Sequence, residues 1–400
     1  MKIRIHKYTI ESVLVLLPCL NIVVLNSAIP GLSTIFYYFR LLMILYILAN
    51  TYVSRARFAS SMKMILLFVL WIIGVSILRG GAVSSSIRAF STPLLLCLYV
   101  DQKRNRPYLV ECIGVWVGIL LTLVIIDFIT QILFPSGMYR DSMYTLNWFL
   151  GYKTARLVYE LPLCVFEAIH SMWKNNKLGK RFYLCSILSV YTLYHGQATS
   201  AMVTLALICV FIILICNTEK KVENIDRFWE CMVNMKIVVP VYTVATLLTV
   251  YIQNSPLIQF VVVNILKKDP TLSTRTSIWN NCIEVLRTHP ITGVGYLSIE
   301  KYQEISNNIY ATSAHNMSLT ILVSGGFLAI ALYIGIMITA SRNLKKNHSI
   351  YNKIASIGVI AVLIVGITSS SIVFSMCGFI FYLLMEINIS ISSCNRKGIE

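Results

Sequence analysis

Apolar runs recur along the whole chain and are separated by short polar segments. Many are about 16–25 residues long, which is the length that a helix needs to cross the ~30 Å hydrocarbon core of a bilayer. The pattern predicts an all-α polytopic membrane protein with about twelve transmembrane helices. The predicted spans are residues 12–29, 32–50, 62–78, 84–100, 110–134, 157–173, 182–195, 199–216, 236–252, 317–340, 354–370 and 372–391.

The composition agrees with this pattern. Hydrophobic residues make up 57% of the 400 residues, charged residues only 13%, and the mean hydropathy is +0.73. Soluble domains carry nearer ~25% charged residues, so an ordinary soluble protein is excluded. The 11 cysteines form no C-x-x-C pair and no metal-binding spacing, so we interpret them as small buried side chains and expect neither disulfides nor a metal site.

The chain is strongly basic, with 34 Lys and Arg against 17 Asp and Glu. In a soluble protein this would suggest nucleic acid, but here the basic residues gather in alternate short loops, as they do in cytoplasmic loops of membrane proteins. Twelve spans place every cluster on one side together with both termini. We therefore expect cytoplasmic termini and no nucleic-acid partner. The clusters lie at residues 2–7, 55–63, 103–106, 174–181, 220–227, 342–353 and 396–397.

Two segments on the opposite side are longer than a hairpin needs, at residues 135–156 and 253–316. The second is the longest polar segment and lies between the ninth and tenth predicted spans. We expect residues 1–400 to form a single membrane domain. Loops beyond ~12–15 residues are usually functional or disordered. Because this one contains Trp279 and a proline-glycine turn, we expect a large, partly folded extracytoplasmic loop.

His315 is the first candidate for chemistry, because it lies where this loop meets a long apolar segment. A neutral imidazole there could accept a proton from a substrate. Asn316 could orient the ring, and Gly325-Gly326 would let backbones approach closely. The alternative is a histidine that caps the helix or lies at the membrane interface.

Arginines in the predicted outer loops form a second group of candidates, since the positive-inside rule disfavours them there. The planar guanidinium suits phosphate oxygens, so an anionic substrate would explain their presence. Arg275, at the start of an amphipathic stretch, is the strongest candidate, followed by Arg88 and Arg156 near span ends. The alternative is a set of solvated loop charges without a ligand.

Acidic residues within predicted spans form a third group: Asp127, Glu160 and Glu167. Ionisable groups at membrane depth are functional candidates, but pairing with a neighbouring arginine for packing explains them equally well. The sequence contains no P-loop, no H-E-x-x-H and no G-x-S-x-G. Nucleotide-driven transport, zinc proteolysis and α/β-hydrolase chemistry therefore lack support.

Residues 272–329 resemble the O-antigen polymerase and ligase superfamily of bacterial envelope polysaccharide assembly. Its members typically show an Arg, a Trp a few residues on, an h-P-x-x-G-x-G turn, then H-N and a closing G-x-x-G, in which Ala329 here replaces the second glycine. The stretch 149–162, F-L-G-Y-K-T-A-R-L-V-Y-E-L-P, also looks like the passage from loop to span in polysaccharide polymerases. The matching residues are Arg275, Trp279, His289-Pro290, Gly293, Gly295, His315-Asn316 and Gly326.

This resemblance implies glycosyl transfer from undecaprenyl pyrophosphate at the outer face of the bacterial cytoplasmic membrane, without a metal or other cofactor. We assign the acceptor proton to His315 and the departing pyrophosphate to Arg275, helped by Arg156 and Arg88. His289 and Asn316 join the substrate-binding residues. The implied partners are the undecaprenyl-pyrophosphate-linked oligosaccharide, membrane lipids and a chain-length regulator protein.

Three functions remain open from the sequence. The stretch 149–162 favours a polymerase, which adds the growing glycan to the next lipid-linked repeat unit. A ligase would use the same chemistry to transfer the finished glycan to lipid A core. A transporter or lipid-linked sugar flippase is permitted by Asp127 and Glu167, although the long outer loop has no role in it.

Overall fold

The computed structural model describes residues 6–106, 108–140, 146–152, 154–218, 234–251, 275–309, 311–344 and 349–387. Several predicted features fall outside these ranges. They are residues 253–274 of the large loop, the basic residues at 2–5, 220–227, 345–346 and 396–397, and residues 252 and 388–391 at the ends of two predicted spans.

The described chain is mainly helical, which confirms the predicted fold class at that level. A small three-stranded antiparallel sheet interrupts the helices within the predicted outer segment 135–156: β1 (Tyr139–Arg140), β2 (Leu146–Trp148) and β3 (Gly151–Tyr152). The helices are α1 (Lys7–Leu16), η1 (Leu17–Cys19), α2 (Val23–Ala28), α3 (Leu32–Val53), α4 (Ser60–Leu78), α5 (Val83–Lys103), α6 (Leu109–Leu133), α7 (Leu157–Asn175), α8 (Lys180–His195), α9 (Thr199–Thr218), α11 (Met235–Tyr251), α13 (Arg275–Thr288), α14 (Ile299–Ser306), α15 (Met317–Leu344), α16 (Ile350–Gly366), η4 (Ser371–Phe374) and α17 (Ile380–Glu386).

Six helices among the described residues are long and apolar enough to cross a membrane: α3, α4, α5, α6, α9 and α15. Two further apolar segments, 236–250 in α11 and α16, are shorter. These helices indicate a membrane protein, whereas the predicted count of twelve spans is not confirmed. In the described part of the predicted large loop, residues 275–316, the chain forms α13 and α14.

Three predicted spans are not continuous helices, and one of them, 317–340, lies in α15, which is broken at Gly326. The span 12–29 is divided into α1, η1 and α2, and Pro18, which has no backbone N–H, lies at the break. The span 372–391 begins as the short η4 and resumes as α17 after Gly378, whose backbone lies directly against the Val373 carbonyl. Runs of apolar residues therefore overestimated the helix length at both ends of the chain.

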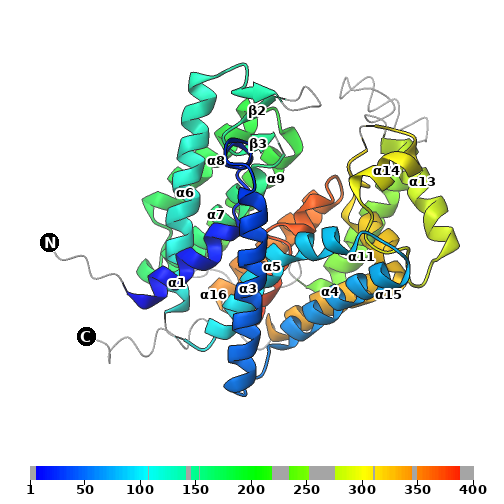
Figure 1. Ribbon diagram of the computed structural model, residues 1–400. Helices are drawn as coiled ribbons and strands as arrows, with labels where there is room; N and C mark the ends of the chain where they lie inside the picture. The colour runs from blue at the N-terminus through cyan, green and yellow to red at the C-terminus, as the bar shows by residue number, and fades with distance from the viewer. Residues whose placement is uncertain are drawn as a thin grey trace.

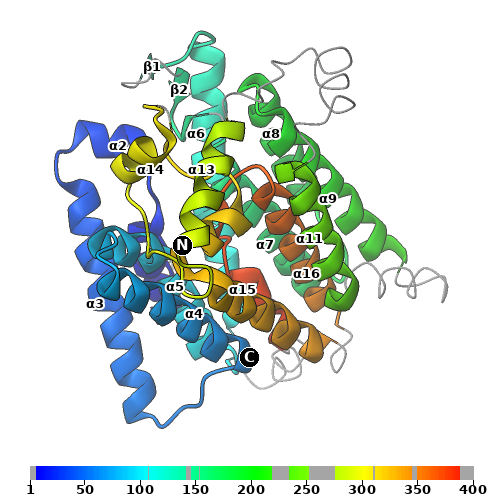
Figure 2. The same ribbon diagram turned by 90° about the vertical axis from the view of Figure 1, so that its right-hand side faces the viewer.

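Two apolar cores hold the helices together. The larger one includes Phe68 of α4, whose ring packs against Phe90 of α5 and Phe379 just before α17. The smaller one joins α13 and α14 to the start of α15 and includes Trp279 and Tyr302. Figures 1 and 2 show α13 and α14 lying together above α15. The helices of the loop that carries the candidate residues thus pack against α15, which also belongs to the larger core.

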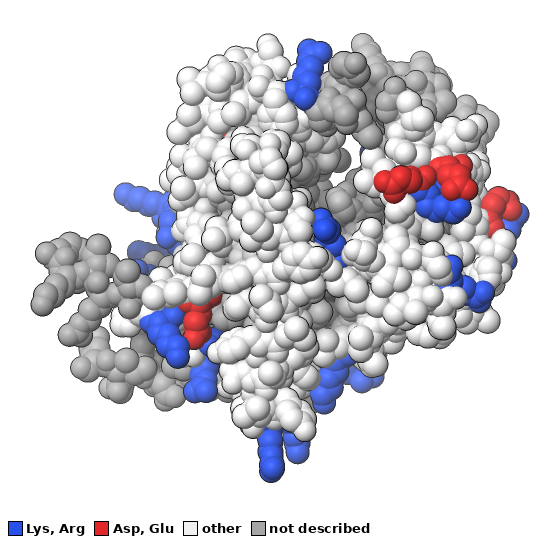
Figure 3. Space-filling view, in the orientation of Figure 1, with Lys and Arg blue, Asp and Glu red and all other residues white. Residues whose placement is uncertain are grey.

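The outer surface suits a lipid environment. Side chains of α3 such as Ile35, Leu42 and Leu45 are 62–64% exposed. On the face in Figure 3, several lysines and arginines lie along the lower margin, much of the central surface above them is uncharged, and further charged residues lie at the right. Large exposed apolar areas of this kind are rare on soluble monomers, which supports the interpretation as a membrane protein.

Candidate functional site

The turn after α13 is joined to a break in α15. Gly326 has φ 67° and ψ −165°, which interrupts the helix and leaves backbone groups on both sides without their helical partners. The N–H groups of Phe327 and Leu328 donate instead to turn carbonyls, and turn N–H groups donate to the carbonyls of Val323 and Ser324. The bonds are Val294 N to Val323 O at 2.9 Å, Gly295 N to Ser324 O at 3.2 Å, Phe327 N to Pro290 O at 2.9 Å and Leu328 N to Ile291 O at 3.2 Å.

Glycine is required on both sides of this junction. Gly293 has φ 71°, and a Cβ there would lie 2.6 Å from the Val323 carbonyl oxygen. A Cβ on Gly326 would clash with the Ile291 carbonyl. The close backbone approach predicted at Gly325-Gly326 is confirmed, and the glycines of the two motif halves are the residues that bring the turn and α15 together.

Trp279 attaches α13 to the segment that carries His315. Its indole is 2% exposed in the smaller core, and Nε1 donates to the Ala314 carbonyl at 2.7 Å. His315 follows directly in the left-handed conformation, with φ 49°. This conformation costs a non-glycine residue about 1–2 kcal/mol, and residues held in it often mark functional sites.

Asn316 fixes the backbone on the other side of His315. It is fully buried; its Oδ1 accepts from Leu319 N at 2.9 Å at the start of α15, and its Nδ2 donates to Ile367 O at 3.0 Å, just after α16. Both ends of the amide are therefore used by backbone groups, and the expected orientation of the imidazole by Asn316 is not observed. Asn316 instead holds the ends of two helices together.

Arg275 lies close enough to His315 for its charge to act on the imidazole. Its Nη1 donates to Thr368 O at 3.1 Å, next to the carbonyl that Asn316 binds. Burial lowers the pKa of Arg275, and Tyr152 of β3 acts in the opposite direction. Burial and then the charge of Arg275 lower the pKa of His315 from 6.5 to about 4. The imidazole is therefore neutral at neutral pH, next to a cation, and its ring makes no hydrogen bond within the described part of the chain.

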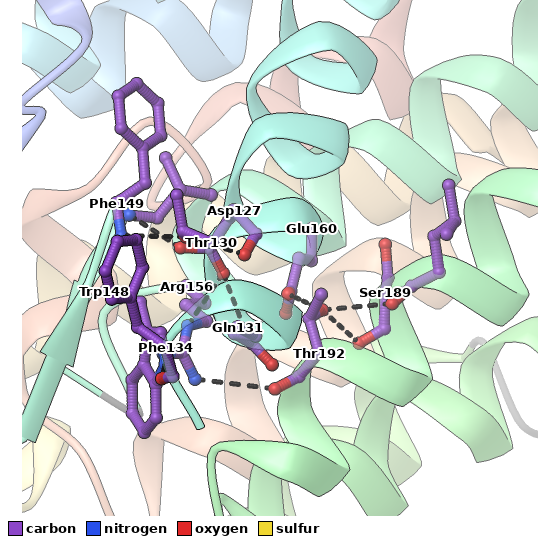
Figure 4. Close-up of polar contacts among 12 residues, drawn as sticks. Asp127, Thr130, Gln131, Phe134, Trp148, Phe149, Arg156, Glu160, Ser189 and Thr192 are labelled. Atoms are coloured by element: carbon purple, nitrogen blue, oxygen red, sulfur yellow. Dashed lines mark hydrogen bonds and ion pairs between the residues drawn. The ribbon is translucent and has the colours of Figure 1, made fainter. Parts of the chain in front are cut away.

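Arg156 is placed differently from the sequence expectation. Its guanidinium is fully buried, with Nε 3.0 Å from Asp127 Oδ2 and Cζ 4.6 Å from the centre of the Trp148 ring. Nη1 also donates to Thr192 O at 3.4 Å (Figure 4). Because Asp127 in turn accepts from Leu150 N at 2.7 Å, the pair ties the small sheet to α6 and α7.

The other acidic residues in predicted spans also contact protein groups, although Oε2 of Glu160 is buried without a hydrogen-bond partner in the described part of the chain. Glu167 forms an ion pair with Arg181, and Glu160 accepts from Thr192 Oγ1 at 2.5 Å (Figure 4). Of the two explanations left open by the sequence, pairing with a neighbouring arginine is what the structure shows for Asp127 and Glu167.

His289 and Arg88 lie elsewhere. His289 follows the last residue of α13, a 14-residue helix, so about 20 Å of helix separates it from Arg275. Its Nδ1 lies 2.9 Å from Thr288 Oγ1. Arg88 is exposed on α5, with Cζ 4.8 Å from the centre of the Tyr37 ring. The structure thus brings together Arg275 and His315, but neither His289 nor Arg88 with them.

Sequence reasoning missed Arg40, an arginine in the middle of α3 that is only 9% exposed. An arginine within an apolar run was the available signal. It also missed the segment 367–368, whose carbonyls hold Asn316 and Arg275. Nothing in the sequence marks those two residues, because they act through backbone oxygens.

The part of the chain that contains this geometry matches a known protein family. Residues 184–334 match the family described as O-antigen ligase, and the matched region contains Arg275, Trp279, His289 and His315. That family covers O-antigen polymerases as well as ligases, and its members are glycosyltransferase-like enzymes. Comparison with curated proteins found no relative of the chain. The match of residues 184–334, which include α13 and His315, supports a relation of this part of the chain to the O-antigen ligase and polymerase superfamily.

Proposed function

We propose that the protein is a bacterial polymerase of O-antigen or another surface polysaccharide. It transfers the growing glycan from undecaprenyl pyrophosphate to the next lipid-linked repeat unit at the outer face of the cytoplasmic membrane. The observation that carries this proposal is that Arg275 and Asn316, the neighbour of His315, both lie in the region that matches the family and donate to the adjacent carbonyls of Thr368 and Ile367.

The chemistry follows from the two residues. The acceptor hydroxyl oxygen attacks the anomeric carbon of the donor glycan and forms the new glycosidic bond. The bond from that carbon to the pyrophosphate breaks, and the pyrophosphate leaves with the electron pair. His315 takes the hydroxyl proton, and Arg275 stabilises the negative charge that develops on the leaving group. The reaction as written requires no metal and no nucleotide sugar.

The other candidates receive different parts in this proposal. Asn316 positions His315 through the backbone, since both ends of its amide are occupied. Arg156 anchors the small sheet through Asp127 rather than binding pyrophosphate. About 20 Å of helix separates His289 from Arg275, so we assign His289 a contact with the glycan and not with the pyrophosphate.

In this proposal both termini are cytoplasmic and the Arg275–His315 pair faces the outer side. The gathering of basic residues in alternate predicted loops supports this orientation. Membrane lipids and the undecaprenyl-pyrophosphate-linked oligosaccharide are then the immediate partners. A chain-length regulator protein is a further partner in the proposal.

A complementation experiment tests the function. In a strain that lacks the protein, we expect wild type to restore long polysaccharide chains and His315→Ala or Arg275→Ala to fail, with equal membrane insertion. Arg287→Ala is the matched control, because Arg287 is an exposed arginine at the other end of α13, paired only with Glu284 among the described residues. Long chains made by His315→Ala would contradict the proposal.

A ligase is the second candidate, because the matching family is described as O-antigen ligase. The same strain separates the two functions. Loss of a polymerase leaves single repeat units on lipid A core, whereas loss of a ligase leaves long chains on the lipid carrier. The transporter reading is weaker, because Asp127 and Glu167, which permitted it, are paired with Arg156 and Arg181.

A further inference from the structure

A cavity lined by two arginines includes neither Arg275 nor His315 among its lining residues. The cavity has a volume of about 390 Å³. Its walls are formed by α3, α5, the start of α7 and the segment 371–376. Two arginines, Arg40 and Arg88, contribute to the lining; amide and hydroxyl groups include Asn21, Asn26, Tyr159 and Ser375. We call it the Arg40–Arg88 cavity.

The two arginines lie close together without a counter-ion. Both guanidinium groups face the ring of Tyr37, at 6.0 Å for Arg40 and 4.8 Å for Arg88. Arg40 donates from Nε to Ser91 Oγ at 2.8 Å and from Nη1 to Pro18 O at 2.5 Å, which are neutral acceptors. Among the residues that the structure describes, neither arginine forms an ion pair. A buried cation next to a second cation is costly unless an anion compensates the charge.

The cavity is connected to the Arg275–His315 pair by a short piece of chain. Ile367 and Thr368 accept hydrogen bonds from Asn316 and Arg275, and Ser371 and Ser375, a few residues on, line the cavity. Other walls come from the first turns of helices: Tyr159 lies in the first turn of α7, and Arg88 near the start of α5. In the predicted topology these helix ends all lie on the outer side.

We propose that the Arg40–Arg88 cavity binds the pyrophosphate of the acceptor, the second polyprenyl-pyrophosphate-linked saccharide, while Arg275 binds that of the donor. This inference rests on the proposed polymerase function. The donor pyrophosphate leaves the reacting carbon and must lie next to the catalytic base. The acceptor hydroxyl belongs to the far sugar of its repeat unit, so the acceptor pyrophosphate must lie about one repeat unit away.

The properties of the cavity agree with such a ligand. Its volume is at the lower end of the ~300–1,000 Å³ typical of small-molecule sites, which suits a pyrophosphate with its first sugar rather than a whole oligosaccharide. Two guanidinium groups match the phosphate oxygens. Asn26 Nδ2 donates to Asn21 Oδ1 at 2.5 Å and the Tyr159 hydroxyl donates to Asn21 O at 2.8 Å. The amides still have further donors and the hydroxyl can still accept, so these groups can also bind sugar hydroxyls. Separate sites also keep the two like-charged pyrophosphates apart.

Equilibrium binding tests this directly. The full chain is reconstituted in phosphatidylcholine nanodiscs and titrated with radiolabelled undecaprenyl pyrophosphate. We expect two sites per wild-type chain and one site each in Arg88→Gln and Arg275→Gln. If Arg40→Gln does not fold, Arg40→Lys takes its place, because it keeps a charge at the buried position. We expect Arg40→Lys to weaken binding about tenfold at the site that Arg88→Gln removes. Arg79→Gln, which removes an exposed arginine at the end of α4, should keep both sites.

Competition identifies the ligand. The assignment would be overturned if phosphatidylglycerol or inorganic pyrophosphate displaced the probe from the cavity as effectively as unlabelled undecaprenyl pyrophosphate does. A single site in wild type, or two intact sites in Arg88→Gln, would also overturn it. Kinetics gives a second readout, in which Arg88→Gln raises the KM for the acceptor and leaves kcat at saturation unchanged. If wild type elongates no glycan, the proposed function fails, whatever the binding stoichiometry. If elongation is normal and Arg88→Gln changes neither binding nor KM, only this inference fails.

Discussion

The low pKa of His315 predicts an unusual pH dependence of elongation. Burial and the charge of Arg275 lower this pKa to about 4, and the neutral imidazole is the form that accepts a proton. At pH 5.5 a histidine with a pKa of 6.5 would be about 9% neutral, whereas one with a pKa near 4 would be about 97% neutral. We therefore expect kcat/KM, which reflects the free enzyme, to stay flat from pH 8 down to about 5.5 and to fall only as the pH approaches 4.

The bound pyrophosphate should shift this profile in a known direction. Its negative charge offsets that of Arg275, so the pKa of His315 rises in the complex and the acid limb of kcat lies at higher pH than that of kcat/KM. Because the substrate also titrates, the ring of His315 is followed directly by NMR of histidine-labelled protein, with His315→Gln identifying its signal. A ring pKa at or above 6.5 in the free protein would refute the reasoning.

Three further predictions concern the framework of the site. Gly326→Ala should lower Tm and cut elongation, because φ 67° with ψ −165° costs alanine about 1–3 kcal/mol and its Cβ meets the Ile291 carbonyl. Gly118→Ala, with open space around it, should leave Tm unchanged or higher, and equal Tm values for the two variants would contradict this. Asn316→Ala should destabilise by about 1–2 kcal/mol and slow elongation without changing the KM for the acceptor, as thermal unfolding and kinetics would show. Arg156→Met alone should destabilise by about 3–5 kcal/mol because it leaves Asp127 buried and unpaired, and adding Asp127→Leu should restore much of the loss in a thermal-unfolding cycle; a milder single variant would mean that the ion pair is not structural.

Local patterns predicted the features that depend on local sequence. Apolar runs identified α3, α4, α6 and α9 as long helices, because burial in lipid leaves a continuous signature. The glycines at 325 and 326 predicted a close approach of backbones, since few other reasons place two glycines together in an apolar helix. The break at Pro18 was missed because the run of apolar residues continues through it.

Hydrogen bonds and ion pairs between residues far apart in the chain could not be predicted from the sequence. Asn316 was expected to orient its neighbour His315, but its amide bonds to Ile367, 51 residues further along the chain. Arg156 was read as a loop cation because nothing in its surroundings shows that Asp127 on α6 faces it. Pairing of this kind depends on how the helices pack, which apolar periodicity does not encode.

A single-turnover elongation assay in nanodiscs, with defined lipid-linked repeat units as donor and acceptor, tests the central claim most directly. The account predicts that His315→Gln and Arg275→Gln each lower the rate by at least about 100-fold at unchanged insertion and folding, and that Arg287→Gln keeps the wild-type rate. Elongation by His315→Gln within about tenfold of wild type would contradict the assignment of His315 as the group that accepts the proton.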